Sequence, residues 1–413
     1  MSAVAVLLSA FLSAVLFSQA GGLDIMSDPT GGGLLVASGG GVIAGSVIAG
    51  SLVAMFVRGR VVVAVLAVAS AATAGITSML LSPSVFEYVA VLSGGILLGC
   101  AAVLAVSLSG ARLQAMLAAG FLCGLFTAGA LGALETDVPD RYYEYLTEAQ
   151  RSTPVIVPAV AALTALAALW ACRRPFVATT VERSRRVLVV AIMIPLCGLL
   201  THWLFVRQLY DSSGDMVDIF YFGIIAVPVL LVAAALMPAR SGAAILAGTA
   251  VLAAASTSSG IGLDASSPTW TYGFIAGTLA AVAVGVGVGL RWKNPTAGFV
   301  VLAIVCLTAL FDRPPLDNIG FVASHVVLPA AAAYAFVSIM PMTVSSSAVG
   351  LTVPVTITVP LIVTYGWTAY TPLTDVDTST FSPDADLWMS TGVAVGTVVL
   401  AGVALELLRR RRA

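Results

Sequence analysis

Apolar runs of about twenty residues recur along the whole chain, separated by short polar segments. A helix needs about 20 apolar residues to cross the hydrocarbon core of a bilayer, so each run predicts one membrane-spanning helix. The run at 347–368 alternates threonine with apolar residues, but a lone strand leaves its backbone unsatisfied in lipid, so helix is predicted there too. The pattern predicts fourteen spans: 3–20, 33–57, 61–81, 87–108, 112–134, 154–172, 187–207, 218–238, 241–262, 270–290, 296–311, 320–340, 347–368 and 388–408.

Composition supports this pattern. Of the 413 residues, 59% are hydrophobic and 9% are charged, against about 25% charged residues in a typical soluble domain. A soluble fold cannot hide so much apolar surface. We therefore predict an all-α polytopic membrane protein. Residues 1–20 end in a sequence that resembles a signal-peptidase site, but no Lys or Arg precedes the apolar stretch, so the first span is expected to be retained.

Charged residues sort between the two sides of the membrane. If the N-terminus is cytoplasmic, 15 of the 19 Lys and Arg residues fall on the inside, and all acidic residues except Glu182 and Glu406 fall outside. This is the distribution that the positive-inside rule describes. It predicts a multi-pass protein of the plasma membrane, in bacteria the inner membrane, with both termini in the cytoplasm. The Ala- and Val-rich, Lys-poor composition suggests a bacterial source.

The chain also shows signs of an internal repeat. The basic turns at Arg58 and Arg240 are 182 residues apart (240 − 58), and those at Arg112 and Arg291 are 179 apart (291 − 112). This predicts a six-plus-six parallel repeat, which is typical of secondary transporters with a substrate site between the halves. The predicted domains are a six-helix bundle at 1–172, a cytoplasmic basic linker at 173–186, a second bundle at 187–340, and two additional helices with a basic tail at 341–413.

The stretch 50–60, between spans two and three, resembles the signature loop of the major facilitator superfamily, Gly-x-Leu-Ala-Asp-Arg-x-Gly-Arg-Arg/Lys. Gly50, Leu52 and Arg58 match, whereas Ala54 stands where the family has its Asp. In the family that Asp takes part in a charge relay that steadies one conformation. The second-half equivalent is expected at 234–242. The resemblance implies a transporter whose conformational signature loop comprises Gly50, Leu52, Arg58, Arg60 and Arg240.

Ionisable residues inside spans are costly and are candidates for function. All the candidates fall in the outer half of the membrane: Asp24, Glu87, His202, Arg207 and His325. The resemblance implies that spans one, four, seven and ten line a cavity, which would bring all except His325 together. We expect Glu87 and His202 to face a shared outward cavity and exchange a proton, with Arg207 as partner. The alternative is that each side chain reaches separately to the lipid headgroups.

Two local features concern packing. Small residues four apart, as at Gly273 and Gly277 or at Gly285 and Gly289, let helices approach closely. Prolines inside spans bend their helices, and in transporters such bends often flank the pathway. These prolines are Pro158, Pro195, Pro228 and Pro329.

Other chemistry is not indicated. No Gly-rich loop ends in Lys-Ser or Lys-Thr, so no nucleotide site is predicted. The five cysteines form no CxxC pair and have no nearby His, so neither a metal nor a cofactor is expected. A net charge of −1 gives no nucleic-acid footprint. The chain is not expected to be an enzyme.

Three functions fit the sequence. The first is a secondary transporter of a hydrophobic or lipid-like compound, with an apolar lining and with Asp24, Glu87 or His202 as candidates for proton coupling. The second is a non-catalytic subunit or scaffold with a membrane protein partner. The third is a polyprenyl-phosphate-dependent glycosyltransferase with Asp24 or Asp28 as base. The expected partners are membrane lipids and a hydrophobic or amphipathic small molecule.

Overall fold

The structure of the protein is a computed structural model. It describes residues 2–19, 39–80, 83–108, 110–135, 156–176, 185–211, 220–237, 241–257, 268–311, 317–340, 342–356 and 385–410.

Helices account for almost all of these ranges, and no strand occurs within them. The helices of the first part are α1 (Ser2–Gln19), α2 (Gly39–Phe56), α3 (Arg60–Leu80), α4 (Pro83–Ser107), α5 (Ala111–Glu135), α6 (Ile156–Ala171), α7 (Arg185–Asp211) and α8 (Phe220–Leu236). Those of the second part are α9 (Gly242–Thr257), α10 (Pro268–Arg291), α11 (Pro295–Leu307), η5 (Thr308–Phe311), α12 (Asp317–Val322), η6 (Ala323–Val327), α13 (Leu328–Ser338), α14 (Val344–Thr356) and α16 (Ala385–Arg410).

Because η5 continues α11, and α12, η6 and α13 form one unbroken helix, the described residues contain fourteen helical bodies. Each body lies within or over one predicted span, including the span with the strand-like alternation, which is helical over Val344–Thr356. Six of the helices are long and apolar enough to cross a membrane by length and composition. The predicted fold class is confirmed: the chain is an all-α polytopic membrane protein.

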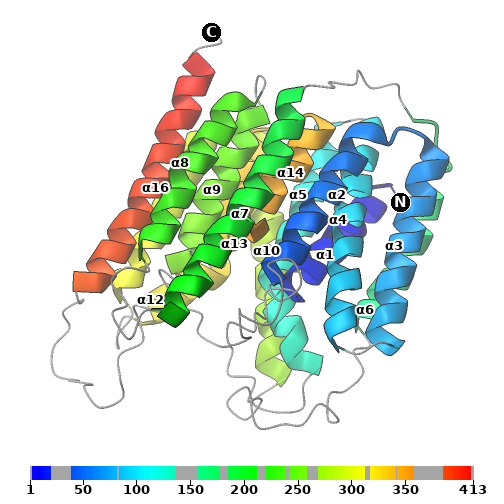
Figure 1. Cartoon of the computed structure of the whole chain (residues 1–413), viewed down its shortest axis with the longest axis horizontal. Helices are drawn as coiled ribbons and strands as arrows, with labels where there is room; N and C mark the ends of the chain where they lie inside the picture. Colours follow the sequence, from blue (N-terminus) through cyan, green and yellow to red (C-terminus); the bar gives the residue numbers. More distant parts are fainter. Residues whose placement is uncertain are drawn as a thin grey trace.

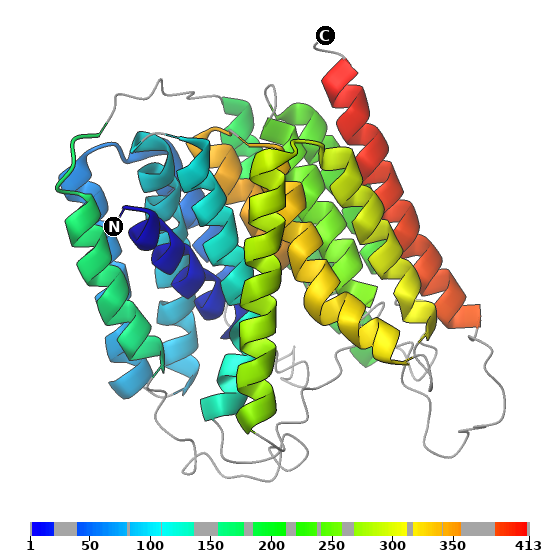
Figure 2. The ribbon, with the colours of Figure 1, turned by 180° about the vertical axis from the view of Figure 1, so that it is seen from behind.

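The helices pack in the same pattern twice (Figures 1 and 2). In the first half, α1 contacts α4, α5 and α6, while α2 lies on α4, and α3 lies on α4 and α6. In the second half, α9 contacts α13, α14 and α16, while α10 lies on α13, and α11 lies on α13 and α16. Helices α1 to α6 therefore correspond in order to α9, α10, α11, α12–α13, α14 and α16. The corresponding helices begin between 229 (268 − 39) and 240 (242 − 2) residues apart.

The repeat extends to single residues at the closest helix contacts. A Cβ atom added at Gly50 on α2 would collide with the backbone carbonyl of Gly95 on α4. A Cβ atom added at Gly285 on α10 would collide with the backbone carbonyl of Ala330 on α13. Gly285 follows Gly50 by 235 residues (285 − 50), and Ala330 follows Gly95 by the same number (330 − 95). Small residues let helix backbones approach closely in membranes, so the same contact is built twice.

The position of the second half corrects the predicted domains. The repeat begins again at α9, not at residue 187, so the two helices outside it are α7 and α8 rather than the last two. Helix α7 contacts α2 and α14 as well as α8, and Figure 1 shows it between α8 and α9 on one side and α2 on the other. The offset near 180 misled because evenly spaced helices give regular offsets at any shift by two spans. Spacing alone does not fix which helices correspond.

The two halves meet along six of the described helices, three from each half. Helices α2 and α4 of the first half contact α14, and α5 contacts α10 and α13. The view from behind shows α10 (yellow-green) standing uncovered in front of this junction (Figure 2). Its exposed face includes Trp270, Tyr272 and Val284.

One end of the molecule carries the arginines and lysines whose side chains the structure describes. They lie in turns or helix ends that alternate along the chain and so share one side, where the C-terminus also lies (Figure 1). These residues are Arg58, Arg60, Arg112, Arg173, Arg174, Arg185, Arg186, Arg291, Lys293, Arg409 and Arg410. None of the charged side chains that the structure describes is buried. We refer to this side as the basic end, and the positive-inside rule predicts that it faces the cytoplasm.

Candidate functional site

The predicted site residues are only partly visible in the described chain. Asp24 lies outside the described residues. The structure places Glu87 on α4, and His202 and Arg207 on α7, but it does not describe their side chains. The convergence of Glu87 and His202 on one cavity therefore stays a prediction. His325, on η6, is described in full.

The observed repeat changes which helices are equivalent to α1 and α4. The prediction that spans one, four, seven and ten line the cavity assumed that the second half begins at residue 187. With the second half beginning at α9, the counterparts of α1 and α4 are α9 and α12–α13. His325 thus lies on the helix equivalent to the one that carries Glu87, at nearly the same level (87 + 235 = 322). Helix α7, with His202 and Arg207, lies outside the repeat.

His325 sits in an aromatic setting between two helices. Its ring stacks on Phe321 with centroids 4.4 Å apart, and Phe274 of α10 meets the ring edge-on at 4.8 Å. Its Nδ1 lies 2.7 Å from the Ser324 hydroxyl and 2.9 Å from the Phe321 carbonyl oxygen. The tautomer decides which of these bonds forms. The ring is half-buried, and its orientation is fixed by these contacts.

His325 lies where the hydrogen-bond ladder of this continuous helix changes. Residues Ala323–Val327 form one π-helical turn, in which the backbone N–H of Leu328 donates to the Ala323 carbonyl five residues earlier. Pro329 follows directly and has no N–H to continue the regular ladder. Such single π turns occur frequently at functional sites. The proline could be read from the sequence. The π-helical turn beside it, which carries the His325 that contacts Phe274, could not.

The resemblance loop has its own geometry. Arg58 donates to the carbonyl oxygens at the end of α2, to Ala54 at 2.9 Å, Met55 at 2.7 Å and Val57 at 2.8 Å. It thereby caps α2, because the last carbonyls of a helix lack partners within it. Ala54 is fully buried. Gly50 makes the close contact with α4 described above, while Leu52 is exposed.

The second-half counterpart of this loop differs from the predicted one. The turn 57–59 between α2 and α3 corresponds to 292–294 between α10 and α11, so Lys293 is the equivalent of Arg58 (293 − 58 = 235). There the Tyr334 hydroxyl of α13 donates to the Asn294 carbonyl at 2.8 Å. The predicted equivalent at 234–242 joins α8 to α9 instead, and Arg240 lies outside the described residues.

The buried polar side chains among the described residues are all neutral. Hydroxyls bridge helices in the first half, where Ser13 of α1 donates to the Gly94 carbonyl of α4 at 2.7 Å and Ser46 of α2 donates to the Val91 carbonyl of α4. Gln114 is the largest buried polar side chain among the described residues. The described part of the interior therefore offers hydrogen bonds to a neutral molecule but no counter-ion to a charged one.

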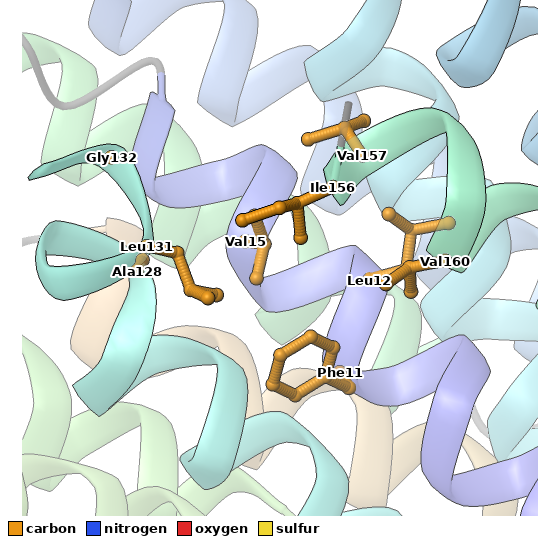
Figure 3. A pocket seen from close by; sticks show the side chains of 9 residues that line it. All are labelled: Phe11, Leu12, Val15, Ala128, Leu131, Gly132, Ile156, Val157 and Val160. Carbon is orange, nitrogen blue, oxygen red and sulfur yellow. The ribbon is translucent and has the colours of Figure 1, made fainter. Parts of the chain in front are cut away.

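A small apolar cavity lies inside the first half, between α1, α5 and α6 (Figure 3). Its volume is about 50 Å³, which lies between the volumes that one and two water molecules occupy in the liquid, at about 30 Å³ each. Figure 3 shows the side chains of Phe11, Ile156 and Val160 pointing into the same space. It is lined by Phe11, Leu12, Val15, Ala128, Leu131, Gly132, Ile156, Val157 and Val160. Sequence reasoning missed it because aliphatic residues give no signal for a void.

Comparison with known proteins supports the fold. At the level of sequence, no family model and no curated protein matches the chain. Among solved structures, the chain is similar to the major facilitator superfamily proton:xylose symporter XylE bound to 6-bromo-6-deoxy-D-glucose, with a TM-score of 0.51 at 13% identity, over 97% of this chain and 93% of that one. The chain therefore has a major facilitator-like fold.

Two further structures show lower scores. One is FucP, a major facilitator superfamily transporter in the outward conformation, with a TM-score of 0.47 at 13% identity, over 99% of both chains. The other is a bacterial homologue of the human drug peptide transporters PepT1 and PepT2, with a TM-score of 0.47 at 14% identity, over 99% of this chain and 98% of that one.

Proposed function

We propose that this chain is a secondary transporter that moves a hydrophobic or lipid-like small molecule by alternating access between two halves, α1–α6 and α9–α16. The observation that carries the proposal is the twice-built packing, in which six helices on each side meet along α2, α4 and α5 with α10, α13 and α14. Repeats of this kind let one half rock against the other around a site between them. The major facilitator-like fold supports the same reading.

The proposed substrate class follows from the interior. Every buried polar side chain in the described residues is a hydroxyl or an amide, and no described carboxylate or basic group is buried. Because a charged substrate in low dielectric needs a paired charge, these helices suit a neutral apolar or amphipathic molecule better. The proposed location is the plasma membrane, with both termini in the cytoplasm.

Transport by the purified full-length protein in proteoliposomes tests the proposal. A lipophilic neutral fluorophore loaded on one side should cross faster than in protein-free vesicles of the same lipid, and a hexose of similar size should not. Faster passage of the hexose alone would contradict the substrate class. A protein that moves neither molecule and co-purifies with a fixed membrane protein would support the scaffold alternative.

Proton coupling is the finer part of the proposal, with Asp24, Glu87, His202, Arg207 and His325 as candidates. A carboxylate or imidazole in the outer half could exchange a proton during each cycle. Glu87→Gln should abolish the pH dependence of transport yet leave the protein folded. His325→Gln is the matched test on the equivalent helix. A pH profile that neither substitution changes would contradict coupling through these two residues.

A further inference from the structure

One side-chain amide joins the two halves at the basic end. Gln114, in the first turn of α5, belongs to the first half, and Met342, between α13 and α14, belongs to the second. The Gln114 Nε2 donates to the Met342 carbonyl at 2.9 Å, and the Met342 backbone N–H donates to the Gln114 Oε1 at 2.8 Å. Both ends of the amide are thus held by the backbone of a single residue, 228 positions away.

This contact is shielded from solvent. The exposed fractions are 5% for Gln114 and 7% for Met342. A buried amide group that loses its partners bears a desolvation penalty, which makes the half-broken arrangement less favourable than either the intact contact or full separation. The two hydrogen bonds are therefore expected to form and break together.

The loop that presents Met342 is itself held in place. Thr343 precedes α14, and its hydroxyl lies 2.8 Å from the Ser346 hydroxyl and accepts from the Ser346 backbone N–H at 3.4 Å. The Ser347 hydroxyl donates to the Thr343 carbonyl at 3.0 Å. The bond from the Ser346 N–H caps the N-terminus of α14, as Thr side chains commonly do. The residue that follows Met342 is thus tied to the first turn of α14.

We infer that the Gln114–Met342 contact holds the basic end closed, and that opening of this end requires both hydrogen bonds to break. The inference rests on the proposed function, because alternating access supplies the opening. In the family that the signature loop resembles, a charge relay steadies one conformation. Here Ala54 stands in place of that acidic residue. A neutral amide contact between the halves takes over the steadying role.

The neutral character of the contact gives a distinguishing property. Salt screens interactions between exposed charges but has little effect on buried hydrogen bonds between neutral groups. The ratio of open to closed molecules at the basic end should therefore be the same at low and high ionic strength. A strong salt dependence of this ratio would contradict the inference.

The decisive experiment measures the opening directly, without substrate. Spin labels are attached to cysteines introduced by Arg112→Cys in the first half and Lys293→Cys in the second, both exposed at the basic end. Of the five native cysteines, four are buried, so the introduced ones react first. The distance distribution between the labels in the full-length protein in nanodiscs then reports the populations of closed and open molecules.

Gln114→Ala should raise the ratio of open to closed molecules roughly five- to thirty-fold, the effect of losing two buried hydrogen bonds. Gln114→Asn, one methylene shorter, should act in the same direction if Gln114→Ala does not fold. Two controls should leave the ratio unchanged. Met342→Ala keeps the backbone groups that bind Gln114. Ser347→Ala removes a bond at the equivalent position of the second half (347 − 114 = 233) that stays within its own half.

The outcomes separate the two proposals. A ratio that Gln114→Ala leaves unchanged, or that both controls shift equally, overturns the inference, as does a single unchanged distance in every variant. If Gln114→Ala shifts the ratio but the protein moves no molecule across vesicles, the contact stands and the transport proposal fails.

Discussion

The α2–α4 contact of the first half and the α10–α13 contact of the second are the same junction built in two ways. In the first half, Gly50 meets Gly95, and a further glycine, Gly99, lies against the Gly50 carbonyl. In the second half, Gly285 meets Ala330. The helix that carries Ala330 contains a π turn just before this contact. One junction brings backbone against backbone along regular helices, while the other combines close packing with an irregular helix.

This contrast indicates where each half can change shape. Two regular helices in backbone contact can move only as a unit, because interiors packed this closely have no space to deform into. A π turn beside a proline is a local irregularity at which a helix can bend. If the halves rock against each other, we expect the first half to move as a rigid body and the second to bend at 323–329.

The largest test asks whether the two junctions belong to parallel repeats at all. Gly59 and Asn294, in the equivalent turns, should both be labelled from the cytoplasmic side after Gly59→Cys or Asn294→Cys, since equivalent turns of a parallel repeat share one side. A membrane-impermeant maleimide applied to intact cells and to inverted vesicles measures this. Cysteines at Thr180 and Ser379 extend the test to the predicted inside linker and outside loop. Labelling of Asn294→Cys from the opposite side to Gly59→Cys would end the comparison.

The next test replaces a glycine of the first half with the alanine found at the equivalent position of the second half. Gly95→Ala copies Ala330, but a Cβ atom at residue 95 would collide with the backbone oxygen and hydroxyl of Ser46. We expect destabilisation by about 1–3 kcal/mol, the usual cost of overpacking, measured by thermal unfolding in detergent. Gly45→Ala is the matched control on α2, because nothing lies within 4 Å of its added Cβ. Equal stability of the two variants would show that the first junction is looser than described.

A smaller effect is expected at the π turn. His325 contacts Phe274 edge-on, and aromatic pairs of this kind contribute about 0.5–1.5 kcal/mol beyond their buried area. A double-mutant cycle with His325→Ala and Phe274→Ala should give a coupling free energy of this size. Helix α4 has no π turn at this level, so the first half offers no equivalent pair for such a cycle. A coupling near zero would mean that the π turn does not fix the ring.

The smallest effect concerns the hydroxyl that bridges α2 and α4. Ser46→Ala removes its hydrogen bond to the Val91 carbonyl. Polar bonds between membrane helices average about 0.6 kcal/mol, so we expect a small loss of stability on thermal unfolding. Thr77→Ala is the control, since Thr77 bonds only within its own helix, to Thr73 and Ala74. A loss in Ser46→Ala no larger than in Thr77→Ala would remove the hydroxyl from the junction's energetics.

The helices could be predicted from the sequence because lipid enforces them. A backbone in hydrocarbon must satisfy its own hydrogen bonds, so every long apolar run is expected to form a helix. Even the threonine-rich run at 347–368 is helical over its described part. The correspondence between the halves could not be read from helix spacing. Its signal was the pairing of small residues, Gly50 with Gly285 and Gly95 with Ala330, at one common offset. Only contacts between helices reveal that this offset is the meaningful one.

The candidate site was less predictable, for a different reason. Rarity of ionisable residues singled out His325, but its place depends on which helices correspond, and that was wrong in the predicted domains. The bond between Gln114 and Met342 carried no signal, since a glutamine near a span end is ordinary and its partner is a backbone. Asp24 and the side chains of Glu87, His202 and Arg207 stay predictions.

If the chain transports a lipophilic molecule as proposed, helix α7 affects the route by which that molecule could enter from the bilayer. The halves meet along two seams, α2 with α14 and α5 with α10. Helix α7, which lies outside the repeat, covers the first by contacting both α2 and α14, whereas the described helix that contacts both α5 and α10 is α13, which belongs to the second half itself. A molecule dissolved in the bilayer would therefore meet a sealed wall on one flank and an uncovered seam on the other. The packing of the repeat is symmetric, but the proposed access from the lipid is on one side only.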